Sequence, residues 1–288
     1  MILLDGVQAA HAIRKRVAGE VAAFSRKIGL TVVLVGSDPA SKLYIASKRR
    51  ACAAVGITST VLEFPAKLSE EKLLGEIDRL NADTAVDGIL VQAPLPSHIS
   101  SKRVFERLDP TKDVDGFHPL NVGRLLMGEE GPVSCTPLGI SLLLSHYKIP
   151  VAGKRVVILG RSNIVGKPLA ALLMQKNDRG NATVTVAHSA SENLSQITQE
   201  ADILIAAIGR PHFVGPEMVR EGAVVVDVGI NRVADPKREK GYRVVGDVDF
   251  DKVKGKCSAL TPVPGGVGPM TVATLLHNTL KAAHLRSS

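Results

Sequence analysis

The chain has 288 residues, of which 45% are hydrophobic and only 3% aromatic, and its formal net charge is +8. This composition excludes an intrinsically disordered chain, and no run approaches the roughly 20 apolar residues of a membrane-spanning helix. The positive charge suggests acidic partners, but the scarcity of aromatic side chains argues against nucleic acid and leaves phosphorylated small molecules.

The N-terminal segment lacks the features of a secretory signal. Residues 1–6 include an acid and have no basic region followed by an apolar one. Cys52, Cys135 and Cys257 have neither metal-site spacing nor a plausible disulfide framework. We therefore expect a cytoplasmic protein with no membrane association and no bound metal.

The first half of the chain alternates strand and helix signals. A helix is expected to begin after a cap at Asp38, with Pro39 in its first turn, and to end at Gly56. A second helix is expected over residues 69–80. The predicted strands are apolar and unpatterned, and cover residues 31–36, 60–64 and 87–92.

The pattern restarts after Gly153 and continues to the end of the chain. A Gly-rich turn leads into a helix through Met174, and a Pro/Gly-rich stretch precedes a last helix, Met270 to Leu285. Apolar strands that alternate with helices predict an α/β fold with parallel sheets covered on both faces, here in two domains with a boundary near residues 120–150. The predicted strands cover residues 155–159, 183–187, 202–207, 223–228 and 244–246.

The turn at residues 160–166 lies between a strand and a helix, where a dinucleotide fingerprint belongs. It departs from G-x-G-x-x-G, because Ser162 replaces the second glycine and Gly166 comes one residue later. Small residues still let the backbone approach a phosphate, and the next helix offers free N–H groups. The turn therefore indicates a dinucleotide site, although tight packing alone would also explain it.

The end of the following strand favours NADP over NAD. An NAD site normally has an acid there to bind the ribose 2′-hydroxyl, but this strand ends in His188 and Ser189. Arg161 and Ser189 could instead hold a 2′-phosphate. Two alternatives stay open: Glu192 lies close enough in sequence to permit NAD, and Arg161 and Ser189 could be a surface charge and a helix cap.

A lysine lies within the apolar face of the first long helix. At 100° per residue, Tyr44, Lys48 and Cys52 share one side, whereas Arg50 points the other way. Lys48 could extend its head to water or line a cleft and transfer protons. Short-chain dehydrogenases also carry Tyr-x-x-x-Lys, but there the pair follows the dinucleotide turn, so the order here argues against them.

Three further segments have the character of site material. Gln92 ends a buried strand and is followed by two prolines, where α/β proteins open their clefts. Asp113 and Asp115 flank a turn, and without a third ligand they favour recognition of N–H donors over metal. The stretch 264–269 is too stiff for a spacer and suggests backbone close to a ligand.

Together these segments resemble the bifunctional methylenetetrahydrofolate dehydrogenase/cyclohydrolase family, of the bacterial type, over nearly the whole chain. One departure is Ala93, where the family usually has Leu. The segments that carry the resemblance occur in the order of the family, and cover residues 44–48, 91–96, 112–117, 160–166, 228–231 and 261–271.

The resemblance implies an oxidoreductase and hydrolase with two α/β domains flanking a cleft. The folate-binding catalytic domain would comprise residues 1–120 and 269–288, because the C-terminal helix returns to it. A Rossmann-type NADP-binding domain would span 140–268, with 121–139 connecting the two. The reactions would be NADP-dependent oxidation of 5,10-methylene-tetrahydrofolate to the methenyl form and its hydrolysis to 10-formyl-tetrahydrofolate, in a homodimer. These products would serve purine, histidine and methionine biosynthesis.

The resemblance also implies roles for individual residues. Lys48 would manage protons in hydrolysis and Gln92 would hydrogen-bond it, while Tyr44 would stack on the aminobenzoyl ring. Asp115 would accept from the N–H groups of the pterin. The folate would also contact Val91, Pro264, Gly265 and Gly266, and the cofactor would contact Gly160, Arg161, Ser162, Ser189 and Ile230.

Three rival interpretations remain at the level of sequence. A monofunctional methylene-tetrahydrofolate dehydrogenase would share the fold, but Lys48 favours retained hydrolysis. An amino-acid or shikimate-type dehydrogenase would leave Asp115 and residues 264–269 unexplained. A basic, non-enzymatic binding module would predict salt-dependent retention on DNA and no saturable NADP site.

Overall fold

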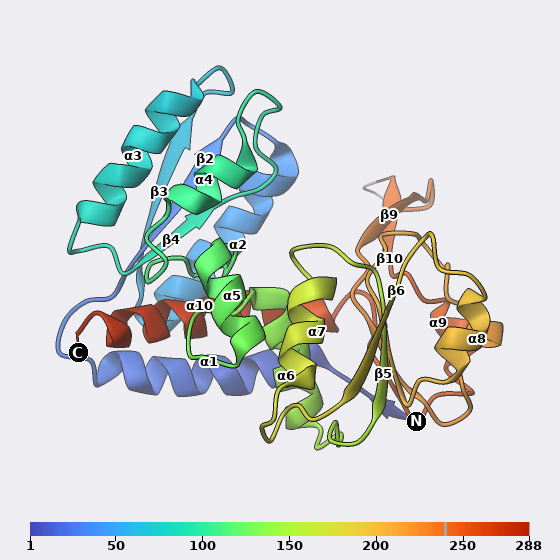
Figure 1. Cartoon of the computed structure of the whole chain (residues 1–288). Helices are drawn as coiled ribbons and strands as arrows, with labels where there is room; N and C mark the ends of the chain where they lie inside the picture. The colour runs from blue at the N-terminus through green and yellow to red at the C-terminus, as the bar shows by residue number, and fades with distance from the viewer. Residues whose placement is uncertain (239–240, 288) are drawn as a thin grey trace. The chain divides into compact units, whose positions relative to one another are not determined.

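The computed structural model describes residues 1–238 and 241–287 and divides into two compact units (Figure 1). Unit 1 comprises Met1–Ala10 and Thr136–Thr271, and unit 2 comprises His11–Cys135 and Val272–Ser288. Each unit is built on its own parallel sheet. This confirms the predicted α/β fold with two domains.

Unit 2 is organised around a three-stranded parallel sheet in the order β3-β2-β4. The central strand is buried from its second residue onward, as expected where helices cover both faces of a parallel sheet. The strands are β2 (Gly29–Val35), β3 (Thr58–Phe64) and β4 (Gly88–Val91).

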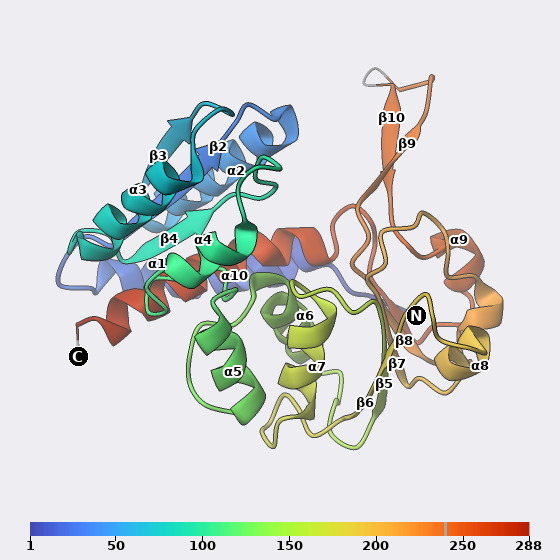
Figure 2. The same cartoon turned by 45° about the horizontal axis from the view of Figure 1, so that its top comes forward.

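Helices cover both faces of this sheet (Figure 2). On one face, Leu30 and Val32 pack in a cluster with Val17, Cys52 and Leu276, which come from α1, α2 and α10. A second cluster on the other face contains side chains of α3 and α4. The helices are α1 (Gly6–Ala22), α2 (Pro39–Val55), α3 (Glu70–Ala82), α4 (Ser101–Arg107), α5 (Pro119–Met127) and α10 (Val267–Leu285).

The predicted helix caps of unit 2 are confirmed. Asp38 is the N-cap of α2 and accepts a hydrogen bond from the backbone N–H of Ser41 at 2.7 Å. Gly56 ends the helix in the left-handed region, at φ +84°. Ser69 caps α3 in the same way as Asp38 caps α2. The return of the C-terminal helix to the first half of the chain is also confirmed, because Leu276 belongs to the core of unit 2.

Unit 1 contains a six-stranded parallel sheet in the order β1-β11-β8-β7-β5-β6. Its central strands β7 and β8 are fully buried, and the helices on its two faces are visible in Figure 1. The strands are β1 (Ile2–Leu3), β5 (Arg155–Leu159), β6 (Thr183–Ala187), β7 (Ile203–Ala206), β8 (Val224–Asp227) and β11 (Ala259–Leu260). The helical segments are α6 (Cys135–His146), α7 (Gly166–Met174), α8 (Leu194–Gln199), the 3₁₀ turn η1 (Pro216–Met218) and α9 (Phe250–Val253).

The first ten residues lie in unit 1, whereas the sequence analysis assigned residues 1–120 to one domain. The cause is a short parallel pairing of β1 with β11. The N–H of Leu4 donates to the carbonyl of Leu260, and the N–H of Gly6 donates to that of Gly265, each at 2.9 Å. A two-residue strand carries no periodicity, so the sequence alone did not indicate this pairing.

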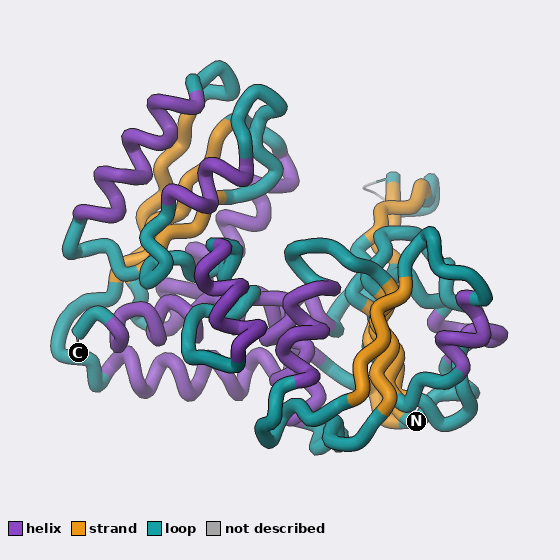
Figure 3. Tube along the Cα trace, in the orientation of Figure 1, coloured by secondary structure: helices purple, strands orange, loops and turns teal. Residues whose placement is uncertain are grey.

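The predicted strand at 244–246 is not part of the parallel series. It forms β10 (Tyr242–Val245), which pairs antiparallel with β9 (Asn231–Ala234) in a separate hairpin (Figure 3). Residues in β9 alternate between half-buried and exposed, which is typical of a strand with one solvated face. The last helix also begins earlier than predicted, at Val267 instead of Met270. Among the described residues, no helix is long and apolar enough to cross a membrane.

Removal of one partner from a buried ion pair is expected to destabilise unit 2. Asp87 is fully buried and accepts two hydrogen bonds from Arg26, at 2.6 and 2.8 Å, and one from the N–H of Gly29. Asp87→Ala leaves these donors without their acceptor, so we expect the free energy of unfolding to fall by about 3 kcal/mol in urea titrations. The control is Asp78→Ala, whose pair with Arg107 is exposed and should contribute little. Equal losses in the two variants would contradict the expectation.

Candidate functional site

Lys48 and Gln92 are brought together from two elements of unit 2. Lys48 lies on α2, is half-buried, and its Nζ donates to Oε1 of Gln92 at 3.0 Å. Gln92 directly follows β4, and its Nε2 donates to the carbonyl of Ala93 at 2.8 Å. Both polar ends of Gln92 are therefore fixed, and its oxygen is directed at the lysine.

The helix face that carries Lys48 is only partly apolar. Ile45 and Cys52 are buried, whereas Tyr44 is 50% exposed. The prediction of a shared face is correct, and Lys48 lies where that face meets solvent. The ring of Tyr44, one turn earlier, is therefore accessible to a ligand near the ammonium group.

Asp115 belongs to the same neighbourhood. The pKa of its carboxyl group is raised to about 6, chiefly by burial; the charge of Lys48 opposes this rise and the charge of Asp113 adds to it. The segment that carries Asp115 runs beside β4, because Asp113 forms a parallel bridge with Ile89. Lys48, Gln92 and Asp115 thus lie near the carboxyl end of β4, where ligands bind in open α/β sheets.

The other two polar residues of this segment hold it in place. Lys112 is 1% exposed, and its Nζ donates to the carbonyls of Leu80, Asn81 and Asp83 at 2.7–2.9 Å, while burial lowers its pKa. Asp113 accepts from the N–H groups of Gly116 and His118 and from Asn121. Both side chains are therefore fully used to hold this segment, whereas the carboxyl group of Asp115 interacts with Lys48 and Cys135.

Two residues of this neighbourhood were missed by the sequence analysis. Asn278 donates to the carbonyls of Val114 and Val133, each at 2.8 Å. The side chain of Cys135 forms a hydrogen bond with Asp115, which lowers the pKa of that carboxyl group. Asn278 lies on α10 and is 3% exposed, in a buried face that also includes Thr274 and Thr279. A polar side chain in the apolar stripe of a helix was the signal that could have revealed it.

The predicted substrate residue Val91 has a core side chain. It is 3% exposed and packs in the cluster with α3 and α4, so only its backbone is accessible to a ligand. Pro264, Gly265 and Gly266 belong to unit 1, where the loop rests on the start of α1. A Cβ on Gly6 would lie 1.7 Å from the carbonyl oxygen of Gly266, so this contact requires glycine.

The predicted dinucleotide turn is built by two glycines of unit 1. Gly160 has φ +118°, and a Cβ there would lie 2.2 Å from the carbonyl oxygen of Ala207. A Cβ on Gly166 would lie 2.0 Å from the carbonyl oxygen of Gly160. The turn therefore packs tightly against the end of β7 and against the start of α7. The side chains of Arg161 and Ser162, which lie between the two glycines, are exposed.

A cavity of about 300 Å³ opens beside this turn. It lies at the carboxyl ends of β5, β6 and β7, where the order of the sheet reverses around β5. Four predicted cofactor residues line it together, whereas Ile230 lies outside it, 53% exposed in the β8–β9 loop. The lining comprises Leu159, Gly160, Arg161, Ser162, His188, Ser189, Leu194, Ala207, Ile208, Arg210 and Phe213.

The described residues that line this cavity include three basic side chains and no acid. Nη1 of Arg161 lies 3.3 Å from Nε2 of His188, and the guanidinium of Arg210 lies over the ring of Phe213 at 4.9 Å. Ser189 does not cap α8, whose N-cap is Asn193. This arrangement suits a phosphate. The sequence analysis did not assign His188 or Arg210, although both follow strand ends.

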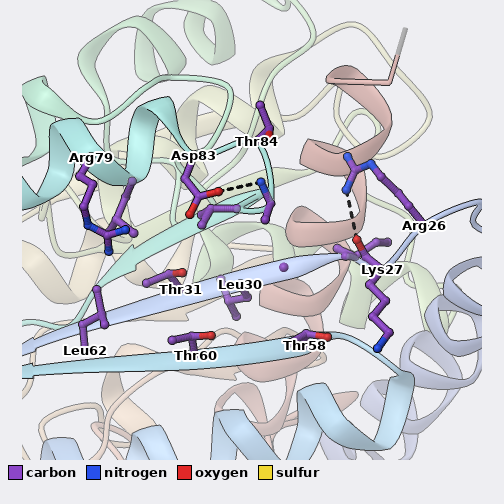
Figure 4. Close-up of a pocket in the computed structure, with 15 residues that line it drawn as sticks. Arg26, Lys27, Leu30, Thr31, Thr58, Thr60, Leu62, Arg79, Asp83 and Thr84 are labelled. Carbon is purple, nitrogen blue, oxygen red and sulfur yellow. Dashed lines mark hydrogen bonds between the residues drawn. The ribbon is translucent and has the colours of Figure 1, made fainter.

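A larger cavity, of about 570 Å³, lies at the opposite ends of the strands in unit 2 (Figure 4). Thr31, Thr58 and Thr60 form part of its lining near the amino ends of β2 and β3. Arg26 also lines it, but this side chain is paired with Asp87. Ligands of parallel sheets bind at the other edge, so this cavity is not the candidate site. Among the described residues, no group of acids, histidines and cysteines has the arrangement of a metal site.

Comparisons with known proteins agree with this geometry. Two family models match: the tetrahydrofolate dehydrogenase/cyclohydrolase catalytic domain over residues 4–115, and its NAD(P)-binding domain over residues 134–287. A bifunctional FolD protein of Prosthecochloris aestuarii is 53% identical over 98% of both chains. The crystal structure of the bifunctional FolD enzyme of Campylobacter jejuni is 46% identical, covers 99% of both chains and has a TM-score of 0.93. A Trypanosoma brucei FolD structure in complex with NADP and an inhibitor is 40% identical, with a TM-score of 0.93 over 100% of this chain and 98% of that one.

The charge of Lys48 should be measurable at Asp115. Lys48→Met removes the positive charge that lowers the pKa of Asp115, so we expect this pKa to rise above its value of about 6. Carboxyl carbon shifts of ¹³C-aspartate-labelled protein, followed by NMR against pH, measure the midpoint. Lys42→Met, at an exposed position of the same helix, is the control and should leave the midpoint in place. An Asp115 midpoint that ignores Lys48 would show that the two groups do not interact.

Proposed function

The chain belongs to the tetrahydrofolate dehydrogenase/cyclohydrolase family, and we propose that it performs both reactions of that family with the residues described above. It is a bifunctional enzyme of one-carbon folate metabolism, an NADP-dependent dehydrogenase for 5,10-methylene-tetrahydrofolate and a cyclohydrolase for the methenyl product. The observation that carries the assignment of residues is the contact between Lys48 and Gln92, with Asp115 close by.

The dehydrogenase step needs orientation more than acid–base chemistry. Bound NADP⁺ would supply the acceptor for a hydride from the methylene carbon, and the adjacent substrate nitrogens would stabilise the cation that remains. Arg161 and Ser189 would hold the 2′-phosphate, while Gly160 and Ser162 present backbone to the phosphates. Ile230 would contribute backbone near the nicotinamide.

The cyclohydrolase step needs a group that moves protons. Water adds to the methenyl carbon and loses a proton, the C–N bond of the ring opens, and the ring nitrogen gains a proton, giving 10-formyl-tetrahydrofolate. Lys48 would serve this transfer. The bond from its Nζ to Gln92 fixes the direction of the ammonium group and occupies one of its three protons.

The remaining predicted substrate residues, from both units, would bind the folate. Tyr44 would stack on the aminobenzoyl ring, which accounts for an aromatic side chain at an exposed helix position. Asp115 would accept two hydrogen bonds from the pterin, and with a pKa of about 6 its carboxyl group is mostly ionised at neutral pH. Val91, Pro264, Gly265 and Gly266 would add mainly backbone contacts.

The roles of the two units, the assembly into a homodimer and the cellular location form part of the same proposal. Residues of unit 2 would form the folate-binding catalytic domain and residues of unit 1 the NADP-binding domain. The family resemblance supports a homodimer formed through the NADP-binding domain. A cytoplasmic location is supported by three buried cysteines that are free thiols.

Lys48→Met should separate the two activities. We expect hydrolysis of methenyl-tetrahydrofolate to fall by at least about 100-fold, because the proton carrier is lost. NADP⁺ reduction should fall far less, because hydride transfer does not use that proton. Absorbance assays with each substrate measure the two rates, and Arg50→Met, on the exposed side of α2, is the control. Undiminished hydrolysis in Lys48→Met would exclude Lys48 as its catalyst.

Arg161→Ala should weaken the preference for NADP⁺ over NAD⁺. Loss of a charged hydrogen bond to the 2′-phosphate predicts a rise in KM for NADP⁺ of about tenfold or more. The KM for NAD⁺, which lacks this phosphate, should change little. Steady-state dehydrogenase assays with both cofactors measure the ratio. Arg155→Ala, another exposed arginine of unit 1, serves as control. Equal rises for both cofactors would assign Arg161 to some other part of the cofactor.

A further inference from the structure

Two buried carboxylates of unit 1 lie close to the loops of the cofactor cavity and have no role in the function proposed above. Asp227 ends β8 and is 3% exposed, and Asp247 follows β10 and is fully buried. A buried carboxylate is costly unless hydrogen bonds compensate its lost hydration. The donors that supply these bonds show what each acid holds.

The carboxylate of Asp247 accepts hydrogen bonds from two different segments of unit 1. Its Oδ2 accepts from the backbone N–H groups of Ile208 and Gly209, at 2.8 and 2.9 Å. Its Oδ1 accepts from the N–H of Arg210 at 2.9 Å and from the side-chain amide of Asn231 at 2.8 Å. One side chain thus holds three consecutive amides of the loop after β7 and joins them to Asn231 at the start of β9.

Asp227 holds Asp247 in turn. Its Oδ1 accepts from the N–H groups of Gly229 and Asp247, and its Oδ2 accepts from that of Val248, all at 2.9 Å. Asp227 therefore fixes the backbone from which the Asp247 side chain extends, together with the start of the β8–β9 loop.

Glycines keep space for both carboxylates. A Cβ on Gly229 would lie 2.4 Å from Oδ1 of Asp247, and one on Gly246 would lie 1.8 Å from Oδ2 of Asp227. Neither contact is possible for a larger residue without displacing the acid. The two acids and the two glycines are therefore closely packed against one another.

We propose that Asp247 is a positioning residue for the nicotinamide cofactor. It sets the backbone of Ile208 and Arg210, which line the cofactor cavity, relative to Asn231 and its neighbour Ile230. The inference rests on the proposed cofactor site. It adds the group that gives this site its shape before the cofactor binds, so that binding does not have to order the two loops.

Asp247→Asn tests the proposal with a side chain of nearly the same size. The amide has one oxygen, so two of the four donors would face an NH₂ group instead of an acceptor. We expect the Kd for NADP⁺ in calorimetric titrations, and its KM in the dehydrogenase assay, to rise at least tenfold. Hydrolysis of methenyl-tetrahydrofolate, which uses no nicotinamide, should stay within about twofold of the unsubstituted enzyme.

Hydrogen exchange of the cofactor-free protein gives a second readout. The amides of Ile208, Gly209 and Arg210 should exchange faster in Asp247→Asn, because they lose their acceptor. Asn231→Ala removes a single donor at a half-buried position, so it should fold normally and give a smaller rise in Kd in the same direction. The control is Asp202→Asn, a partly buried carboxylate at the opposite edge of the sheet that accepts from the N–H of Arg155 and from the side chain of Arg220; this variant should leave the Kd for NADP⁺ unchanged.

The outcomes separate this inference from the function on which it rests. If the unsubstituted protein binds NADP⁺ and both Asp247→Asn and Asn231→Ala bind it equally well, the positioning role is overturned while the proposed function stands. An equal loss of both enzyme activities in Asn231→Ala would also overturn it, because it would assign the contact to general stability. If the unsubstituted protein does not bind NADP⁺, the proposed cofactor site and this inference both fail.

Discussion

The parallel arrangement of the strands is the constraint on which both candidate sites depend. Parallel strands present their carboxyl ends at one edge of a sheet, so residues far apart in the chain meet there. In unit 1 this brings Gly160, Ser189 and Ile208 to one cavity after β5, β6 and β7. In unit 2 it places Gln92 after β4, within reach of Lys48. Most of the candidate site residues therefore lie in loops at strand ends, with Tyr44 and Lys48 on α2 as exceptions, while strands and helices supply a nearly wholly aliphatic core.

The strands that are buried on both sides were the easiest elements to predict. Residues 155–159 form a strand with the predicted bounds, because a continuous apolar run between turn signals has few other structures. Residues 183–187 also keep their predicted bounds, although this edge strand alternates exposed and half-buried residues. The segment 244–246 was assigned to the wrong sheet, because three apolar residues do not reveal their partner. The pairing of β1 with β11 connects segments more than 250 residues apart, and no local pattern encodes such a contact.

Some site residues could be predicted from the sequence, whereas the roles of others depend on contacts in the folded chain. Lys48 and Asp115 could be selected from the sequence because a charge on an apolar helix face, or beside a tight turn, departs from its surroundings. The work of Lys112 and Asp113 could not be foreseen, since it consists of bonds to backbone carbonyls and amides that only the folded chain brings near. The same holds for Asp247, whose four donors come from the loop after β7 and from the first residue of β9.

The division of the chain also bears on how such a protein can be cut or fused. Helices α1 and α10 each contribute residues to both units, since the divisions fall after Ala10 and Thr271. A fragment that begins at residue 136 would lack β1 and would carry the final 17 residues of the other unit. A fragment that ends at residue 135 would expose the apolar surface that Leu276 and Leu280 cover. The two units cannot be separated by a single cut in the chain, so recombination within this family must exchange them together.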